Sequence, residues 1–222
     1  TTLTIGHQSV EIELKTNYPW EGHSELTIIP QKKNTFYQHV RIPGWVNNHP
    51  VPGDLYKFAS EKKSDITFRV NGQIITPVFE NGYAVIKRSW KKGDVVTWDF
   101  PMEVREVIAH EQVKQNKDRI ALQRGPLVYC VEGADNDGKA WDFIIPERAN
   151  YQVEYKHDLL SGVVVISFEA AAFKGGEKPI EIVPYPKLIT AIPYFAWNNR
   201  GSNEMQVWLP KKIKEIRVNP EN

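Results

Sequence analysis

The sequence has very little cysteine: Cys130 is the only one in 222 residues. A single cysteine cannot form an internal disulfide, and it excludes a zinc site built from several cysteines of this chain. Cys130 stands between Tyr129 and Val131, and no histidine, lysine or arginine lies beside it to lower the pKa of its thiol. We therefore interpret Cys130 as a small buried hydrophobic residue rather than a reactive thiol.

The chain also has no marked excess of charge of one sign, since it contains 28 Lys and Arg residues and 27 Asp and Glu residues. Nucleic acids and anionic membranes are bound by basic surfaces, so we expect neither as a partner. No apolar run reaches the roughly 18 residues that would span a bilayer. Residues 1–6 lack the basic and apolar regions of a signal peptide. The cellular compartment is left undecided between the bacterial periplasm and the cytoplasm.

No cluster of metal ligands stands out. The histidines, at positions 7, 23, 39, 49, 110 and 157, show none of the close spacings by which zinc sites are recognised. Residues 135–138, Asp-Asn-Asp-Gly, resemble the start of a calcium loop, but Glu147 comes one position late for the full pattern. We interpret these residues as a solvated turn. We predict that the chain holds no metal ion and no other cofactor.

Paired carboxylates, which glycosidases use as acid and base, occur twice, at Glu103/Glu106 and Glu177/Glu181. A basic residue lies beside each pair, Arg105 in the first and Lys178 in the second. Exposed ion pairing explains both arrangements, so we predict no catalytic residue in the chain.

Alternation of apolar and polar residues is the main structural signal that is present. Val10, Ile12 and Leu14 alternate with charged residues, as in a half-buried strand, and similar short runs recur along the chain. Asn71-Gly72 is a strong hairpin signal, and the runs between residues 66 and 100 indicate an antiparallel meander. About a dozen short strands without a sustained helical period predict an all-β fold.

We expect two antiparallel β-sandwich domains of a jelly-roll-like kind, residues 1–105 and 106–222, each of ordinary domain size. Residues 46–64 interrupt the first with prolines and charges and are interpreted as a surface insertion, in which Asp54 could cap a short helix. The last strand, in about residues 205–222, is assigned to the second domain, with a return to the first as the alternative.

The stretch Arg119–Gly133 has two alternating halves separated by Gly125-Pro126. Glycine gives the backbone freedom and proline lacks an N–H, so the pattern predicts a strand, a break and a second strand. The break is expected to be a bulge, a bend or a sheet edge.

Aromatic residues are abundant, with seven tryptophans and nine tyrosines. Their rings can stack on sugars, and they can equally cover an interface with another domain. Trp141 and Trp197 are expected at turns, and Asn198 and Arg200 bring polar groups to the second of these. These four residues are our candidates for sugar binding or contacts between domains. We favour contacts between domains, because a tethered domain must bury a contact face.

Five motifs, in order along nearly the whole chain, resemble the C-terminal region of glycoside hydrolase family 127, named for β-L-arabinofuranosidase activity. The match continues through Met205–Pro210. The motifs are Asn17–Trp20, Arg41–Trp45, Pro101–Arg105, Arg119–Gly133 and Pro193–Gly201.

The resemblance implies paired β-sandwich domains that follow a catalytic (α/α) barrel. In the family, hydrolysis with retention uses a cysteine nucleophile in a zinc site of cysteines and a glutamate, and that site lies in the barrel. The resemblance therefore implies that this chain is a non-catalytic part, inactive alone, whose partner is its own catalytic barrel. Zinc is expected in that barrel. A carbohydrate-binding module for plant-type glycans is the alternative function, and a homodimer is a further possible assembly.

Overall fold

The computed structural model describes residues 1–62, 66–177 and 181–218. The chain is all-β, and its strands form antiparallel sheets. It divides into two compact units: residues 1–49 with 61–103, and residues 50–60 with 104–222. None of the described helices has the length and apolar character needed to cross a bilayer.

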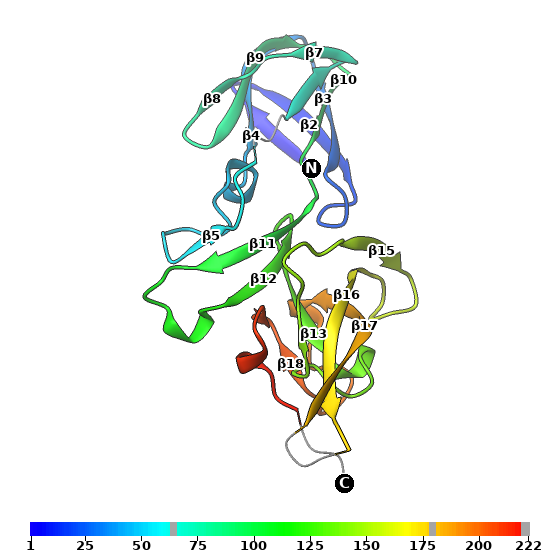
Figure 1. Cartoon of the computed structure of the whole chain (residues 1–222). Helices are drawn as coiled ribbons and strands as arrows, with labels where there is room; N and C mark the ends of the chain where they lie inside the picture. The colour runs from blue at the N-terminus through cyan, green and yellow to red at the C-terminus, as the bar shows by residue number, and fades with distance from the viewer. Residues whose placement is uncertain (63–65, 178–180, 219–222) are drawn as a thin grey trace. The chain divides into compact units, whose positions relative to one another are not determined.

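The first unit has two sheets (Figure 1). A six-stranded sheet has the order β1 (Thr2–Ile5), β2 (Gln8–Thr16), β3 (His23–Pro30), β10 (Asp94–Asp99), β6 (Thr67–Val70) and β7 (Gln73–Ile75). A three-stranded sheet has the order β4 (Asn34–Arg41), β9 (Tyr83–Trp90) and β8 (Val78–Glu80), and the short helix η1 (Gly44–Asn47) follows β4.

Alternate side chains of β3 and β10 in the six-stranded sheet, and of β4 in the three-stranded sheet, are buried, as a period of two requires. Phe68 on β6 lies 6.4 Å, ring centre to ring centre, from Phe79 on β8, so the two sheets are in contact. Trp90 is fully buried at the end of β9, and its indole N–H donates a hydrogen bond to the carbonyl of Phe36 at 3.1 Å. The two sheets therefore pack as a sandwich.

The hairpin predicted at Asn71-Gly72 is confirmed, but the prediction of an antiparallel meander is wrong. Asn71 and Gly72 both have positive φ and join β6 to β7 through a two-residue turn, and Asn81 and Gly82 join β8 to β9 in the same way. Between these hairpins the chain changes sheet at Thr76-Pro77, and β10 then returns to the six-stranded sheet between β3 and β6. Local turn chemistry sets the hairpins, whereas packing of the two sheets decides where each hairpin goes.

The second unit is built on one large sheet (Figure 1). Its main path is β14 (Phe143–Ile144), β16 (Val163–Gly175), β17 (Ile182–Pro193), β13 (Leu127–Glu132), β12 (Arg119–Arg124), β11 (Val104–Ala109) and β5 (Tyr56–Phe58). Three strands pair off this path: β15 (Gln152–Lys156) with β16, β18 (Met205–Gln206) with β13, and β19 (Leu209–Pro210) with β12. The short helices are η2 (Lys114–Asn116), η3 (Gly133–Asp135), η4 (Tyr194–Ala196) and η5 (Ile213–Glu215).

The central stretch forms the hairpin β12–β13. Arg124 pairs with Leu127, so the Gly125-Pro126 break is a two-residue turn, with Gly125 at a φ of 56°. Beyond the turn region the two arms take other partners: Ile120 pairs with Leu209 of β19, and Val131 pairs with both β17 and β18. Apolar side chains from β12, β13, β14, β16 and β17 form one core here.

Two features of the domain boundaries differ from the expectation. The insertion contains β5, which pairs with β11, so residues 50–60 join the second unit instead of decorating the first. No helix follows Asp54, because Tyr56–Phe58 complete a sheet edge as a strand. The strands after residue 204, by contrast, pair within the second unit, to which they were assigned, and not with the first. Residues 63–64 of the insertion and 219–222 of the tail lie outside the described residues.

Candidate docking surface

A loop between β17 and β18 carries the candidate residues Trp197, Asn198 and Arg200. It begins where β17 ends at Pro193 and continues through η4. Asn198 turns the backbone with a φ of 66°, a conformation that asparagine tolerates better than most residues. The Asn199 side chain donates to the carbonyl of Ala196 at 2.9 Å, which ties the turn back to η4.

Arg200 anchors this loop to the second unit. Its guanidinium donates to both carboxylate oxygens of Asp135, at 2.6 and 2.5 Å, and also pairs with Glu132. Glu132 has 0% of its side chain exposed, and Asn203 donates to its other oxygen at 3.1 Å. The hydrogen bonds to Asp135, with those to Glu132, raise the pKa of the Arg200 guanidinium. Arg200 is thus a structural clamp that neutralises a buried carboxylate.

The clamp holds an aromatic surface, which consists of Tyr194, Phe195 and Trp197. The rings of Tyr194 and Trp197 are stacked, with centres 5.9 Å apart and planes 9° apart. Phe195 has 64% of its surface exposed, and Tyr194 is also exposed. Neighbouring exposed aromatic side chains are typical of a surface that binds something. These three residues include no carboxylate, histidine or cysteine.

Trp141 does not join this surface. Its indole N–H donates to the carbonyl of Met205 at 3.0 Å, and the guanidinium of Arg217 lies 5.3 Å from the ring centre. One face and the polar edge of the Trp141 ring therefore contact other groups of the second unit. Of the four candidates, Trp197 and Asn198 are presented at the surface, while Trp141 and Arg200 make structural contacts.

Glu103 and Glu106 each have a partner of their own, whereas Lys178, predicted beside Glu177 and Glu181, lies outside the described residues. Glu103 belongs to the first unit, where it pairs with Lys62. Glu106 belongs to the second unit, where it accepts hydrogen bonds from the Tyr151 hydroxyl at 2.8 Å and the Lys211 ammonium at 2.9 Å. Both carboxylates are thus occupied by partners in separate units.

Neither Cys130 nor the 135–138 turn offers a reaction centre. Burial, with the carboxylates of Glu132 and Asp135 nearby, raises the pKa of the Cys130 thiol to about 12, so it stays protonated at neutral pH. In the turn, Asp135 binds Arg200, and the Asn136 side chain bonds to the backbone of Thr190. The described part of the chain contains no group of three His, Cys, Asp or Glu residues that could hold a metal ion.

Comparison with known proteins agrees with this architecture. Residues 1–102 match the family model "Beta-L-arabinofuranosidase, GH127 middle domain", and residues 104–210 match "Glycoside hydrolase family 127 C-terminal domain". The boundary between the two matches coincides with the change from the first to the second unit near residue 103.

Similar proteins with known names agree with the two family matches. A non-reducing end β-L-arabinofuranosidase from Bifidobacterium longum subsp. longum is 27% identical over 211 residues, which are 89% of this chain and 30% of the relative. A solved GH127 β-arabinofuranosidase is 36% identical with a TM-score of 0.93, over 99% of this chain and 34% of that one. A GH127 β-L-arabinofuranosidase from Geobacillus stearothermophilus T6 is 36% identical with a TM-score of 0.78, over 100% and 32%.

The chain spans about a third of the length of these relatives. Both of its units are accounted for by domains of one family, in the order in which that family carries them. The chain therefore belongs to glycoside hydrolase family 127, and it corresponds to the middle and C-terminal domains of that family.

Proposed function

We propose that this chain is the non-catalytic β-sandwich part of a β-L-arabinofuranosidase-like glycoside hydrolase, in which it supports and docks a catalytic barrel. The observation that carries the proposal is its match to the middle and C-terminal domains of family 127, over about a third of the relatives' length. The chemistry of the described residues agrees, since Glu103 and Glu106 are paired and the Cys130 thiol is protonated.

In this proposal the reacting groups belong to the barrel. The retaining hydrolysis and the zinc ion that the family resemblance implies are assigned there. The chain contributes stability and position, which is a function that two folded β-units can perform. Its own contribution to turnover is indirect, through the placement of the barrel.

The aromatic surface is the proposed point of docking. Phe195 and Tyr194 expose apolar area, and burying such area against a partner is favourable. The Arg200 clamp fixes the loop before the partner arrives, so little conformational entropy is lost on contact. Exposed rings on a pre-ordered loop are therefore suited to a stable contact between domains.

Phe195→Asp tests the docking proposal. A charge placed in a contact of apolar rings should weaken binding of a separately expressed catalytic barrel by at least about tenfold, which corresponds to about 1.4 kcal/mol. Isothermal titration calorimetry measures the affinity. Tyr37→Asp on β4 is the matched control, because Tyr37 is a similarly exposed aromatic residue, at 55% against 64%.

Equal affinities for the unchanged chain and Phe195→Asp would reject this surface as the docking site. Sedimentation of the chain alone tests whether the surface forms a homodimer instead. That explanation holds if Phe195→Asp abolishes self-association and leaves binding of the barrel intact.

A further inference from the structure

The chain contains two Asn-Gly dipeptides, and each forms the two-residue turn of a hairpin in the first unit. Asn71-Gly72 joins β6 to β7, and Asn81-Gly82 joins β8 to β9 (Figure 1). The φ angles are 52° and 79° in the first turn and 51° and 78° in the second. All four residues are exposed to solvent. The two turns therefore have the same residues and nearly the same φ angles, so that differences in their behaviour can be traced to their contacts.

The side chain of Asn71 is held by hydrogen bonds at both of its polar atoms. Its amide nitrogen donates to Oδ1 of Asp94 at 2.9 Å, and its oxygen accepts from the backbone N–H of Val95 at 2.9 Å. Asp94 is 2% exposed, and its other oxygen accepts from the backbone N–H of Lys91 at 3.0 Å, so the acceptor is fixed as well. The carboxamide of Asn71 is thus bound to the start of β10.

The side chain of Asn81 has no such anchor, because no described residue is hydrogen-bonded to it. The contacts of its turn are made by the backbone: the Arg41 guanidinium donates to the carbonyls of Asn81 and Gly82, at 3.3 and 3.1 Å. The Asn81 carboxamide is therefore free to rotate toward the following peptide bond. Glycine obstructs that approach least, since it has no side chain.

An unanchored asparagine side chain before glycine can react with its own backbone. The nitrogen of Gly82 attacks Cγ of Asn81, a C–N bond forms, the Cγ–Nδ2 bond breaks, and ammonia leaves with the proton of the Gly82 N–H. Water then opens the five-membered imide at either carbonyl, which gives aspartate or isoaspartate. Water is the only co-reactant. We propose that Asn81 is a site of spontaneous deamidation in the folded chain, and that its hydrogen bonds protect Asn71 from the same reaction.

Deamidation of Asn81 changes one end of the three-stranded sheet. It adds a negative charge to the turn, beside Glu80 and near the Arg41 guanidinium. Isoaspartate also places a methylene group in the main chain, so the turn loses the backbone that pairs Glu80 with Tyr83. The reaction is independent of the proposed docking, because Tyr194, Phe195 and Trp197 belong to the second unit.

Peptide mapping of the 222-residue chain tests the proposal. Trypsin cuts after Arg69 and Lys87, so one peptide, residues 70–87, contains both Asn-Gly pairs. The folded chain is incubated in mildly alkaline buffer, and fragment spectra of this peptide assign deamidation to residue 71 or 81 over time. We expect Asn81 to react at least about tenfold faster than Asn71, because two hydrogen bonds must break before the Asn71 side chain can reach Gly72.

The same incubation in concentrated urea is the control, because it removes both turns and the contacts of Asn71. The two rates should then become similar. Asp94→Ala removes the acceptor of the Asn71 amide and should speed deamidation of Asn71 while leaving Asn81 unchanged. Thermal unfolding establishes whether this variant is folded, and the comparison with urea stands without it.

Three results would overturn the proposal. The first is an Asn81 that stays intact in the folded chain, and the second is an equal rate at Asn71 and Asn81 in the folded chain. The third is a preference for Asn81 that persists unchanged in urea, since it would come from neighbouring residues in the sequence and not from the hydrogen bonds of Asn71.

Discussion

Arg200→Ala is expected to lower the free energy of unfolding by about 3–5 kcal/mol, the usual result of removing one partner of a buried ion pair. The carboxylate of Glu132 is fully buried, and Arg200 is the cation that pairs with it. Without the guanidinium, a buried charge is left with the amide of Asn203 as a hydrogen-bond donor, and Asp135 loses two hydrogen bonds. Urea denaturation followed by tryptophan fluorescence measures the change.

Two controls show whether the effect comes from the buried charge. Arg148→Ala removes an exposed arginine that has no ion pair among the described residues, and its expected cost is below about 0.5 kcal/mol. In a Glu132→Gln background, Arg200→Ala should cost less than in the unchanged chain, because a neutral amide needs no counter-charge. The account of the clamp is wrong if Arg200→Ala costs the same in both backgrounds.

Trp90→Ala is expected to destabilise the first unit by about 3–5 kcal/mol, as large truncations in cores do. The indole is fully buried, packs with its ring centre 5.9 Å from that of Phe36, and supplies a hydrogen bond to the Phe36 carbonyl. Alanine leaves a cavity and an unsatisfied carbonyl together. The loss should appear in the unfolding transition measured by circular dichroism.

The two parts of the Trp90 effect can be separated. Trp90→Phe keeps an aromatic ring and removes the N–H, so about 1–3 kcal/mol of the loss should remain. Trp197→Ala truncates a half-buried tryptophan at the aromatic surface and should cost clearly less than Trp90→Ala. If Trp90→Ala costs no more than Trp197→Ala, the core of the first unit is not organised as described.

Local features of the fold could be predicted from the sequence. Asn71-Gly72 is a hairpin because both residues tolerate positive φ, and the alternating runs are strands because one face of each is buried. The Gly125-Pro126 break was predicted only as a bulge, a bend or an edge. It is a tight turn because the flanking residues Arg124 and Leu127 pair directly.

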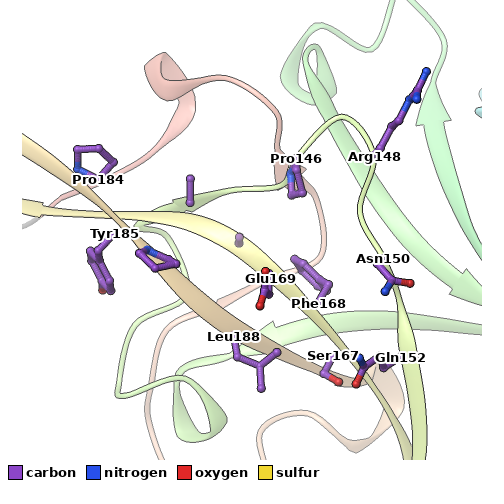
Figure 2. A pocket seen from close by; sticks show the side chains of 13 residues that line it. Pro146, Arg148, Asn150, Gln152, Ser167, Phe168, Glu169, Pro184, Tyr185 and Leu188 are labelled. Carbon is purple, nitrogen blue, oxygen red and sulfur yellow. The ribbon is translucent and has the colours of Figure 1, made fainter.

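Features that depend on distant partners could not be predicted in the same way. β5 has three residues among prolines, too few to show a period, and its pairing with β11 joins residues about fifty positions apart. The position of Arg200 near Asn198 and Trp197 suggested a surface donor, but its partner Glu132 is 68 residues away. A groove of about 720 Å³ beside β16, lined by Pro146, Glu169 and Leu188 among others (Figure 2), gave no sequence signal, because strand pairing alone brings its walls together.

The central claim is that this chain supports a glycoside hydrolase without performing the reaction. The most direct test compares the 222-residue chain with a full-length family 127 protein that contains it, both with zinc, on a chromogenic β-L-arabinofuranoside. The account predicts turnover by the full-length protein and none by the chain alone. Turnover by the chain alone, lost on substitution of Glu106 or Glu103, would contradict the account and place the chemistry in these β-units.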